Sequence, residues 1–378
     1  MKVALVVFPL HYSHGCILQT YALYSKLEQL ECEVTIYDRQ PNKESFATYL
    51  KRAVKRVGKW VLKGYRGPIF FSGYYPKSIM REQLRFIDRF RDDIVSVYST
   101  EELRLRIEAG NYEAIVVGSD QTWRPRNVPN VMDYWLEFAA GMNMKKVAYA
   151  PSFGVDVWEY SEAQTDKCRE LAAKFDAISV REESGVTLCK DHLYVEAKHV
   201  LDPTLLWTKD FYASFAENCP LQEGTLNCYF LDKSEKKSAI GNKIAQQLGL
   251  SVVQVNTKTE DSNASVKERM APSIEKWLSG FRYGEFIVVD SFHAMVFSII
   301  FEKPFIVIGN PRRGMARFES LLGELGLRNR LVTEDVKDVD EIIKSEINWQ
   351  EVRQRLDQKR KACSIFLVNG LGLDAVCA

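Results

Sequence analysis

One histidine follows an apolar run at a position suited to acid–base chemistry. His293 comes shortly after the run 286–289 and opens an apolar stretch, with Ser291 two residues before it. A histidine in the first turn of a predicted helix can carry a proton near neutral pH. The positive helix end disfavours a protonated ring unless an anion binds nearby, so we expect its charge to respond to a substrate. The alternative is a structural histidine that only satisfies its surroundings.

Four arginines follow two other apolar runs, at 177–180 and 304–308. They are Arg181, Arg312, Arg313 and Arg317. A guanidinium can grip a carboxylate or a phosphate with two parallel hydrogen bonds, so these residues are candidates for holding an anionic substrate. The alternatives are a structural ion pair for Arg181 and an ordinary basic surface loop for the other three.

Two loops in the first half of the chain carry small and polar residues typical of a sugar site. A glycine lets the backbone approach a ligand, and Trp123 beside a carboxylate and an amide suits stacking on a sugar ring with directed hydrogen bonds. The alternatives are an ordinary turn for the first loop and a helix cap for the second. The residues expected to bind a sugar are Ser13, His14, Gly15, Gln19, Ser119, Asp120, Gln121 and Trp123.

The elements that must position these residues are short apolar runs that alternate with longer helical stretches. Runs such as 115–117 and 286–289 are apolar on both faces, which is typical of parallel strands covered by helices. The predicted strands are residues 2–8, 33–38, 114–117, 146–149, 177–181, 197–201, 226–231, 252–255, 286–290 and 304–308. The predicted helices are residues 17–29, 78–93, 161–174, 236–247, 295–301 and 317–325.

The alternation occurs twice, which predicts two doubly wound α/β units. The stretch Asp202-Pro203-Thr204 and the polar segment 207–224 mark the junction between them. We therefore predict a first domain at 1–205, on the acceptor side, and a second at 206–345, on the donor side. A helical segment at 346–378 is expected to pack back on the first domain.

Composition and charge exclude several other classes of protein. The 378 residues carry a net charge of +1, which argues against a nucleic-acid partner. The eight cysteines form no Cys-x-x-Cys pair, and no metal-ligand cluster is visible. The first apolar run ends at Pro9 and is too short for a secretory signal, and no run approaches the roughly 20 residues of a membrane span. We expect a cytoplasmic protein with free thiols.

One segment stands out by its charge. Between Glu44 and Glu82 there are nine basic side chains and no acidic one, and within this segment Lys51–Arg66 mixes Lys and Arg with apolar residues. Such a segment is usually a helix that packs its apolar face on the domain. The alternative is a patch that contacts anionic lipid, at the inner face of a membrane, or a diphosphate-linked acceptor.

Taken together and in order, six segments resemble the polysaccharide pyruvyl transferase family. They span residues 1 to about 335, and although each piece alone is weak, the ordered set is specific. The segments are Gly15-Cys16-Ile17-Leu18-Gln19-Thr20-Tyr21-Ala22-Leu23, Gly118-Ser119-Asp120-Gln121-Thr122-Trp123, Tyr149-Ala150-Pro151-Ser152-Phe153-Gly154, Ser179-Val180-Arg181-Glu182, Leu201-Asp202-Pro203-Thr204 and Asp290-Ser291-Phe292-His293.

The resemblance implies a fold like that of GT-B glycosyltransferases, with two Rossmann-like domains facing each other across a cleft. It implies transfer of pyruvate from phosphoenolpyruvate to two hydroxyls of one sugar in a surface polysaccharide or its precursor, without metal or cofactor. His293 would be the acid or base, and Arg181 would hold the donor anion, helped by Arg313 or Arg317.

The chain departs from the family at Ser291, because some members carry Arg two residues before the histidine. The charge would then come from Arg312, Arg313 or Arg317. Many members also carry Asn in the first loop, where this chain has Ser13 or His14. Two other functions remain open on the same residues: a nucleotide-sugar-dependent glycosyltransferase of GT-B-like fold, and a non-catalytic glycan-binding subunit of a polysaccharide assembly system.

Overall fold

The computed structural model describes most of the chain. The described residues are 1–11, 13–43, 50–51, 54–55, 57, 79–216, 223–255, 264–310, 314–336 and 338–374. Most of Lys51–Arg66 lies outside these ranges, as do Arg312 and Arg313. Contact of this segment with a membrane therefore stays a prediction, and so do the roles of the two arginines.

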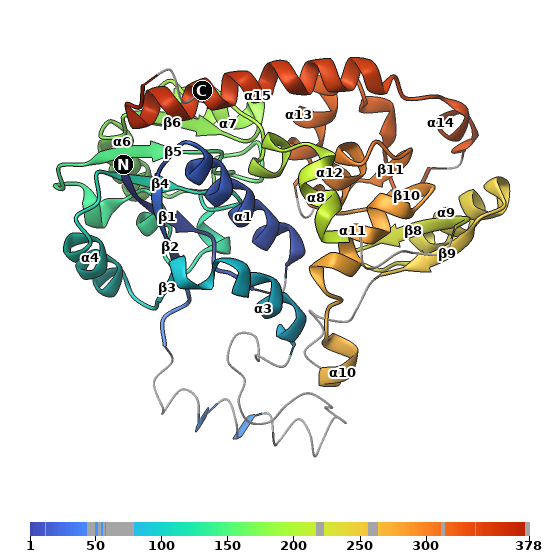
Figure 1. The fold of residues 1–378 in the computed structure, drawn as a ribbon, viewed down its shortest axis with the longest axis horizontal. Coiled ribbons are helices and arrows are strands. Elements are labelled where there is room, and N and C mark those ends of the chain that lie inside the picture. The colour runs from blue at the N-terminus through green and yellow to red at the C-terminus, as the bar shows by residue number, and fades with distance from the viewer. Residues whose placement is uncertain are drawn as a thin grey trace.

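The first half of the chain forms a seven-stranded parallel sheet in the order β3-β2-β1-β4-β5-β6-β7 (Figure 1). Its central strands are wholly or mostly buried because they are apolar on both faces and lie between layers of helices. The strands are β1 (Lys2–Val7), β2 (Glu33–Arg39), β3 (Ile94–Val97), β4 (Ala114–Val117), β5 (Lys145–Ala148), β6 (Ala177–Val180) and β7 (Lys198–His199).

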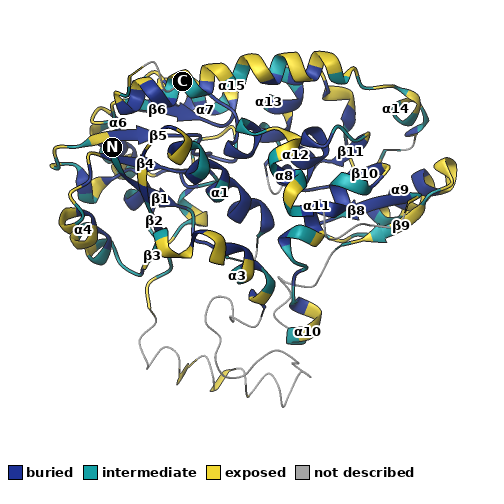
Figure 2. Ribbon diagram, in the orientation of Figure 1, coloured by how far each residue is buried: buried dark blue, intermediate teal, exposed yellow. Residues whose placement is uncertain are grey.

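The second half forms a five-stranded parallel sheet in the order β12-β11-β10-β8-β9. Two of its strands, β10 and β11, are buried at every residue, whereas β9 lies at the edge and is largely exposed (Figure 2). The strands are β8 (Thr225–Tyr229), β9 (Ser251–Gln254), β10 (Phe286–Val289), β11 (Phe305–Ile308) and β12 (Leu331–Val332).

Helices connect the strands and cover both sheets. Several begin at a serine whose side chain accepts a hydrogen bond from the first turn, as Ser13 does from the Cys16 amide at the start of α1. The helices are α1 (His14–Gln29), α3 (Arg81–Ile87), α4 (Thr100–Ala109), α5 (Val131–Tyr134), α6 (Glu162–Ala172), α7 (Glu183–Leu188), α8 (Lys209–Ala216), α9 (Glu235–Leu248), α10 (Val266–Arg269), α11 (Ile274–Tyr283), α12 (Phe292–Ile300), α13 (Ala316–Leu325), α14 (Asp340–Lys344) and α15 (Trp349–Leu371).

The predicted α/β architecture with two Rossmann-like halves is confirmed, with two short strands added. Strands β3 and β12 were not predicted; they are four and two residues long and lie at sheet edges. The predicted junction at 205–206 lies between the two sheets, which span residues 2–199 and 225–332. The domain limits themselves stay a prediction.

Helix α15 runs along the outside of both halves (Figure 1). On the first half it packs against β5 and β6, where a Cβ atom at Gly370 would lie only 2.9 Å from the Cβ of Ala177. On the second half Arg355 donates a hydrogen bond of 2.8 Å to the carbonyl of Glu324 in α13. One cluster of buried apolar side chains contains residues from both sheets, among them Val147 and Ile287. The two halves therefore share a core.

A cluster of charged groups also joins the halves. His199, on β7, has its Nδ1 3.1 Å from a carboxylate oxygen of Glu183 and 3.1 Å from one of Glu324, which also pairs with Lys359. Burial alone would lower the pKa of His199, but the hydrogen bond to Glu324 and the negative charge of this carboxylate together outweigh it, so the pKa is raised.

This raised pKa predicts a dependence of stability on pH. The favourable contribution is complete below the unfolded pKa of about 6.5 and is lost as the pH rises through the higher folded value. The melting temperature should fall over this window in the wild type, and the His199→Gln variant should lack that component. His192→Gln serves as a control, because His192 stacks on Trp158 within the first half. An unchanged pH profile in His199→Gln would contradict the assignment.

Candidate active site

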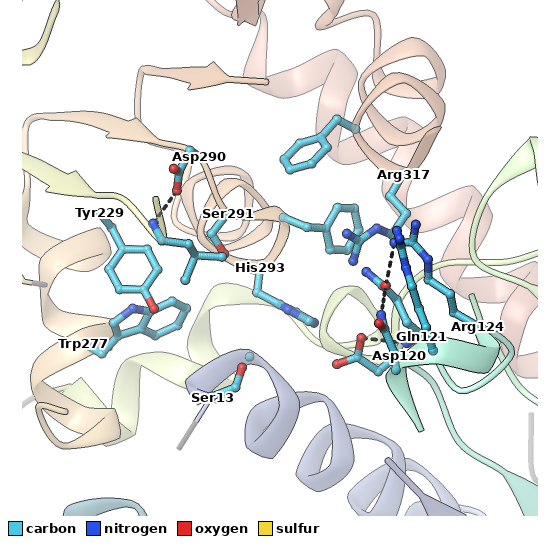
Figure 3. A pocket seen from close by; sticks show the side chains of 16 residues that line it. Ser13, Asp120, Gln121, Arg124, Tyr229, Trp277, Asp290, Ser291, His293 and Arg317 are labelled. Carbon is cyan, nitrogen blue, oxygen red and sulfur yellow. Dashed lines mark hydrogen bonds between the residues drawn. The ribbon is translucent and has the colours of Figure 1, made fainter. Parts of the chain in front are cut away.

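A cavity of about 360 Å³ lies between the two halves (Figure 3). Most of its walls come from loops that follow β1 and β4 in the first sheet and β8 and β10 in the second. It is lined by Ser13, Gly15, Asp120, Gln121, Arg124, Arg126, Asn127, Tyr229, Leu231, Trp277, Asp290, Ser291, Phe292, His293, Arg317 and Phe318.

The topology of the sheets explains this position. In each sheet the next strands along the chain lie on one side of the first strand, and the later strands lie on its other side. As a result β1 lies beside β4, and β8 lies beside β10. Ligands of doubly wound folds bind at such a switch point, outside the carboxyl ends of the strands. Here two switch points face each other across one cavity.

His293 lines the middle of this cavity. Its side chain is 11% exposed, and Nε2 lies 3.5 Å from Oδ2 of Asp202. A Cβ atom at position 15 would lie 2.3 Å from the ring's Cγ and Nδ1, so the absence of a side chain at Gly15 lets the ring pack on the first turn of α1. The N-termini of α1 and α12 thus meet at the cavity, where their partial positive charges favour an anion.

Beneath His293 lies a buried ion pair. Asp202 accepts a hydrogen bond of 2.7 Å from Nη1 of Arg181, and both side chains are at most 1% exposed. Burial raises the pKa of Asp202, but the neighbouring charges of His293 and Arg181 outweigh it, so the pKa lies well below its usual range. The carboxylate is ionised at neutral pH.

Asp120 forms part of the cavity wall in an unusual backbone conformation, with φ = 83°. One of its oxygens accepts a hydrogen bond of 3.0 Å from Nε2 of Gln19, and the other accepts one of 2.7 Å from the amide of Gln121. Burial would raise the pKa of Asp120, but the positive charge of Arg181 helps to lower it. A strained residue held by several partners is typical of a functional position.

Three arginines gather at one end of the cavity. Arg124 forms two hydrogen bonds with the carboxylate of Glu159, of 2.9 and 3.1 Å, while Arg126 is 57% exposed and lies 3.6 Å from the same carboxylate. Burial and the nearby charge of Arg181 lower the pKa of Arg317 to about 10. This end of the cavity is suited to an anionic ligand.

The structure brings seven of the predicted site residues to the cavity and keeps five away from it. Those that line it are Ser13, Gly15, Asp120, Gln121, Ser291, His293 and Arg317. Those that do not are His14, Gln19, Ser119, Trp123 and Arg181, all of which are buried. Their predicted contacts with a ligand are not available in this conformation.

Trp123 is the clearest correction. Its indole is fully buried, stacks on Trp135 with ring centroids 3.9 Å apart, and donates a hydrogen bond of 3.0 Å to the carbonyl of Tyr134. The ring fills the core beside β4, so it cannot stack on a sugar. In the same way, Oγ of Ser119 donates to the carbonyl of Ala150.

His14 and Gln19 contact residues that line the cavity instead. The His14 ring lies parallel to that of Trp277 with centroids 5.2 Å apart, and its Nε2 is 2.7 Å from the carbonyl of Pro272. Burial lowers the pKa of His14 to about 4, so the ring is neutral at pH 7. Gln19 holds Asp120 through the hydrogen bond described above.

The sequence analysis missed Arg124, Arg126, Tyr229, Trp277 and Asp202. The first two directly follow the predicted loop that ends at Trp123, and continuing that loop by three residues would have included them. Tyr229 lies within the predicted strand 226–231 and ends β8. Trp277 comes from a helix with no motif of its own, so no sequence signal pointed to it.

Among the described residues, no group of three or more His, Cys, Asp or Glu side chains is placed to hold a metal ion. Over the same part of the chain, no helix combines the length and the apolar character that crossing a bilayer requires.

Comparison with known structures defines the class of the fold. The UDP-GlcNAc 2-epimerase of Neisseria meningitidis is similar with a TM-score of 0.52 and 10% identity, over 98% of this chain and 99% of that one. The UDP-GlcNAc 2-epimerase of Methanocaldococcus jannaschii is similar with a TM-score of 0.52 and 13% identity, over 97% and 99% of the two chains. The fold is therefore of the GT-B type, with two Rossmann-like halves around a cleft.

The sequence profile of the polysaccharide pyruvyl transferase family matches residues 14–312. This chain belongs to that family. None of the curated proteins compared with it gives a significant match.

The contact between Gly15 and His293 can be tested by stability alone. Gly15→Ala should lower the free energy of unfolding by about 1–3 kcal/mol, because the new methyl group overlaps the imidazole. Adding His293→Ala should recover part of this loss, because it removes the overlapping ring. The recovery should be incomplete, because the Cβ of residue 293 would still lie 2.6 Å from the new methyl group. Gly141→Ala is the control, with no atom within 4 Å of its new Cβ. Strictly additive effects in urea denaturation would show that the contact is absent.

Proposed function

We propose that this protein transfers pyruvate from phosphoenolpyruvate to two hydroxyls of one sugar in a surface polysaccharide or its precursor. The observation that carries the proposal is the placement of His293 in the middle of a cavity whose one end is lined by arginines. Membership of the pyruvyl transferase family supports the same reaction.

The reaction forms two bonds to C2 of the donor. C3 of the enol accepts a proton, one sugar hydroxyl oxygen bonds to C2, and the second hydroxyl oxygen replaces the phosphate when the C2–O bond breaks. Of the two hydroxyl protons, one ends on C3 as part of a methyl group and the other leaves with phosphate. A single imidazole that accepts a hydroxyl proton and passes it to C3 serves this sequence, and the proposal gives this role to His293.

The arginine end suits the donor. Phosphoenolpyruvate carries a carboxylate and a phosphate, and both need cations. Arg126 comes from the first half, and Arg317 comes from the second. Because the cations come from both halves, the donor is held across the cleft rather than by one domain.

The opposite end suits the sugar. Ser13, Tyr229 and Ser291 lie on the other side of His293 from the arginines (Figure 3). Their hydroxyl groups can donate and accept hydrogen bonds, as sugar hydroxyls require. With the donor at one end and the sugar at the other, the imidazole lies between the two reacting groups.

A thermal-shift experiment tests the identity of the donor. Phosphoenolpyruvate at 100 times its dissociation constant should stabilise the protein by about 2.7 kcal/mol. UDP-sugars at the same concentration should have little effect. Stabilisation by UDP-sugars alone would identify a glycosyltransferase and overturn the proposal. Retention of glycan binding by His293→Ala, without turnover in the wild type, would indicate a binding subunit.

Variants test the two functional groups separately. His293→Ala should reduce pyruvate transfer by about 10²–10⁴-fold, as loss of a general acid–base group does, and leave the melting temperature close to that of the wild type. Arg126→Gln should raise the dissociation constant of phosphoenolpyruvate about tenfold or more. Arg104→Gln is the control, because Arg104 pairs with Glu101 and Glu108 on the surface of α4. Equal effects of the two arginine variants would remove Arg126 from the donor site.

A further inference from the structure

We infer that Asp202 is a positioning residue that fixes the tautomer of His293, so that Nδ1 is the nitrogen that exchanges a proton with the substrate. Arg181 then acts through Asp202 and not as a ligand of the donor. The identity of the substrate rests on the proposed function, whereas the tautomer of His293 does not.

The geometry of Asp202 supports this role. The carboxylate is buried, and Oδ1 accepts hydrogen bonds of 3.0 Å from the amide and 2.6 Å from the hydroxyl of Thr204. Oδ2 accepts from Arg181 and is left facing Nε2 of His293 at 3.5 Å. The carboxylate is therefore held in place from three sides, and its fourth neighbour is the imidazole.

A fixed carboxylate selects one tautomer of a neighbouring imidazole. It accepts a hydrogen bond but cannot donate one when ionised, so it favours the proton on the nitrogen it faces, which is Nε2. The distance of 3.5 Å is long for a hydrogen bond, and such contacts shorten when a ligand binds. The lone pair is then on Nδ1.

The two nitrogens also differ in their access to the cavity. Nε2 is buried and has no hydrogen-bond partner among the described residues. Nδ1 is not buried in this way, and His293 lines the cavity. Nδ1 is therefore the ring nitrogen that a substrate in the cavity can reach, while Nε2 faces the carboxylate.

Arg181 is placed to hold carboxylates and is not exposed to a ligand. Its side chain is 1% exposed, does not line the cavity, and has the ring of Phe292 4.8 Å from its guanidinium carbon. Nη1 binds Asp202, and Nη2 lies 3.6 Å from Oδ1 of Asp120. One buried cation thus keeps two carboxylates ionised, one beneath His293 and one in the cavity wall.

Charged groups from several elements lie near His293. Asp202, from the loop before the turn Pro203–Leu206, has Oδ2 3.5 Å from Nε2, and Asp120, after β4, interacts electrostatically with the ring. Arg181, after β6, and Arg317, in α13, interact with the same two carboxylates.

The first test measures the tautomer of His293 directly by NMR. The full chain is labelled with ¹⁵N-histidine, the His293 signals are assigned by their loss in His293→Gln, and the imidazole is titrated. In its neutral form Nε2 should carry the proton and Nδ1 should not. Asp202→Asn, whose amide can donate to Nε2, should shift the population toward the Nδ1–H tautomer. A wild-type ring with the proton on Nδ1 would overturn the inference.

The second test uses steady-state kinetics with phosphoenolpyruvate. Asp202→Asn should lower kcat by about 10²–10⁴-fold, as a wrong tautomer does in other carboxylate–imidazole pairs, and leave KM for phosphoenolpyruvate within about threefold. Asp133→Asn is the matched control: Asp133 forms an equally buried pair with Arg39, 2.7 Å apart, and lies outside the cavity. If both variants lose the same activity, Asp202 is only structural.

Arg181→Lys separates the two roles of the arginine. A positioning residue predicts a lower kcat with a shifted pH profile and a nearly constant KM for phosphoenolpyruvate. A tenfold rise in KM at constant kcat would make Arg181 a donor ligand and overturn the inference. Absence of any turnover with phosphoenolpyruvate would instead refute the proposed function. The NMR measurement would still decide whether Asp202 fixes the tautomer of His293.

Discussion

The contact between His293 and the backbone of Gly15 is the constraint on which the site depends. It brings the first turns of α1 and α12 together, one from each half of the molecule. Two helix N-termini that meet head to head repel each other through their partial positive charges. The buried carboxylate of Asp202 and the wall carboxylate of Asp120 offset this repulsion. An anionic ligand bound between the two helix ends would be favoured for the same reason.

Oppositely charged side chains are buried in pairs near this contact. The pair of Arg181 and Asp202 is almost fully removed from water, and such pairs add little net stability once desolvation is counted. Removal of either partner leaves the other uncompensated, which is far more costly. In the role inferred above, these residues orient His293 rather than stabilise the fold.

The sequence was enough to predict the fold and the edge of each sheet where the site lies. Apolar runs with a hydroxyl, carboxylate or imidazole after them identified the loops of β1, β4 and β10. The direction of each side chain could not be predicted, since it depends on packing across the molecule. One loop places Asp120 in the cavity wall and sends Trp123, three residues later, into the core.

The edge strands show a second limit of prediction from the sequence. β12 has only two residues, and β3 follows a predicted helix directly, so neither gave a distinct apolar run. Arg181 was recognised as important from its place at the end of β6. Its partner Asp202 lies 21 residues further on, and only the folded chain reveals that they form a pair.

Helix α15 has a consequence for how such a molecule can be divided. It crosses from one half to the other, and the apolar cluster beneath it is continuous between the two sheets. A cut at the junction of the sheets would leave this helix with the second half and strip a packed surface from the first. Hybrids that exchange halves between relatives should therefore treat the last helix as part of the N-terminal module, and recombine it together with the strands it covers.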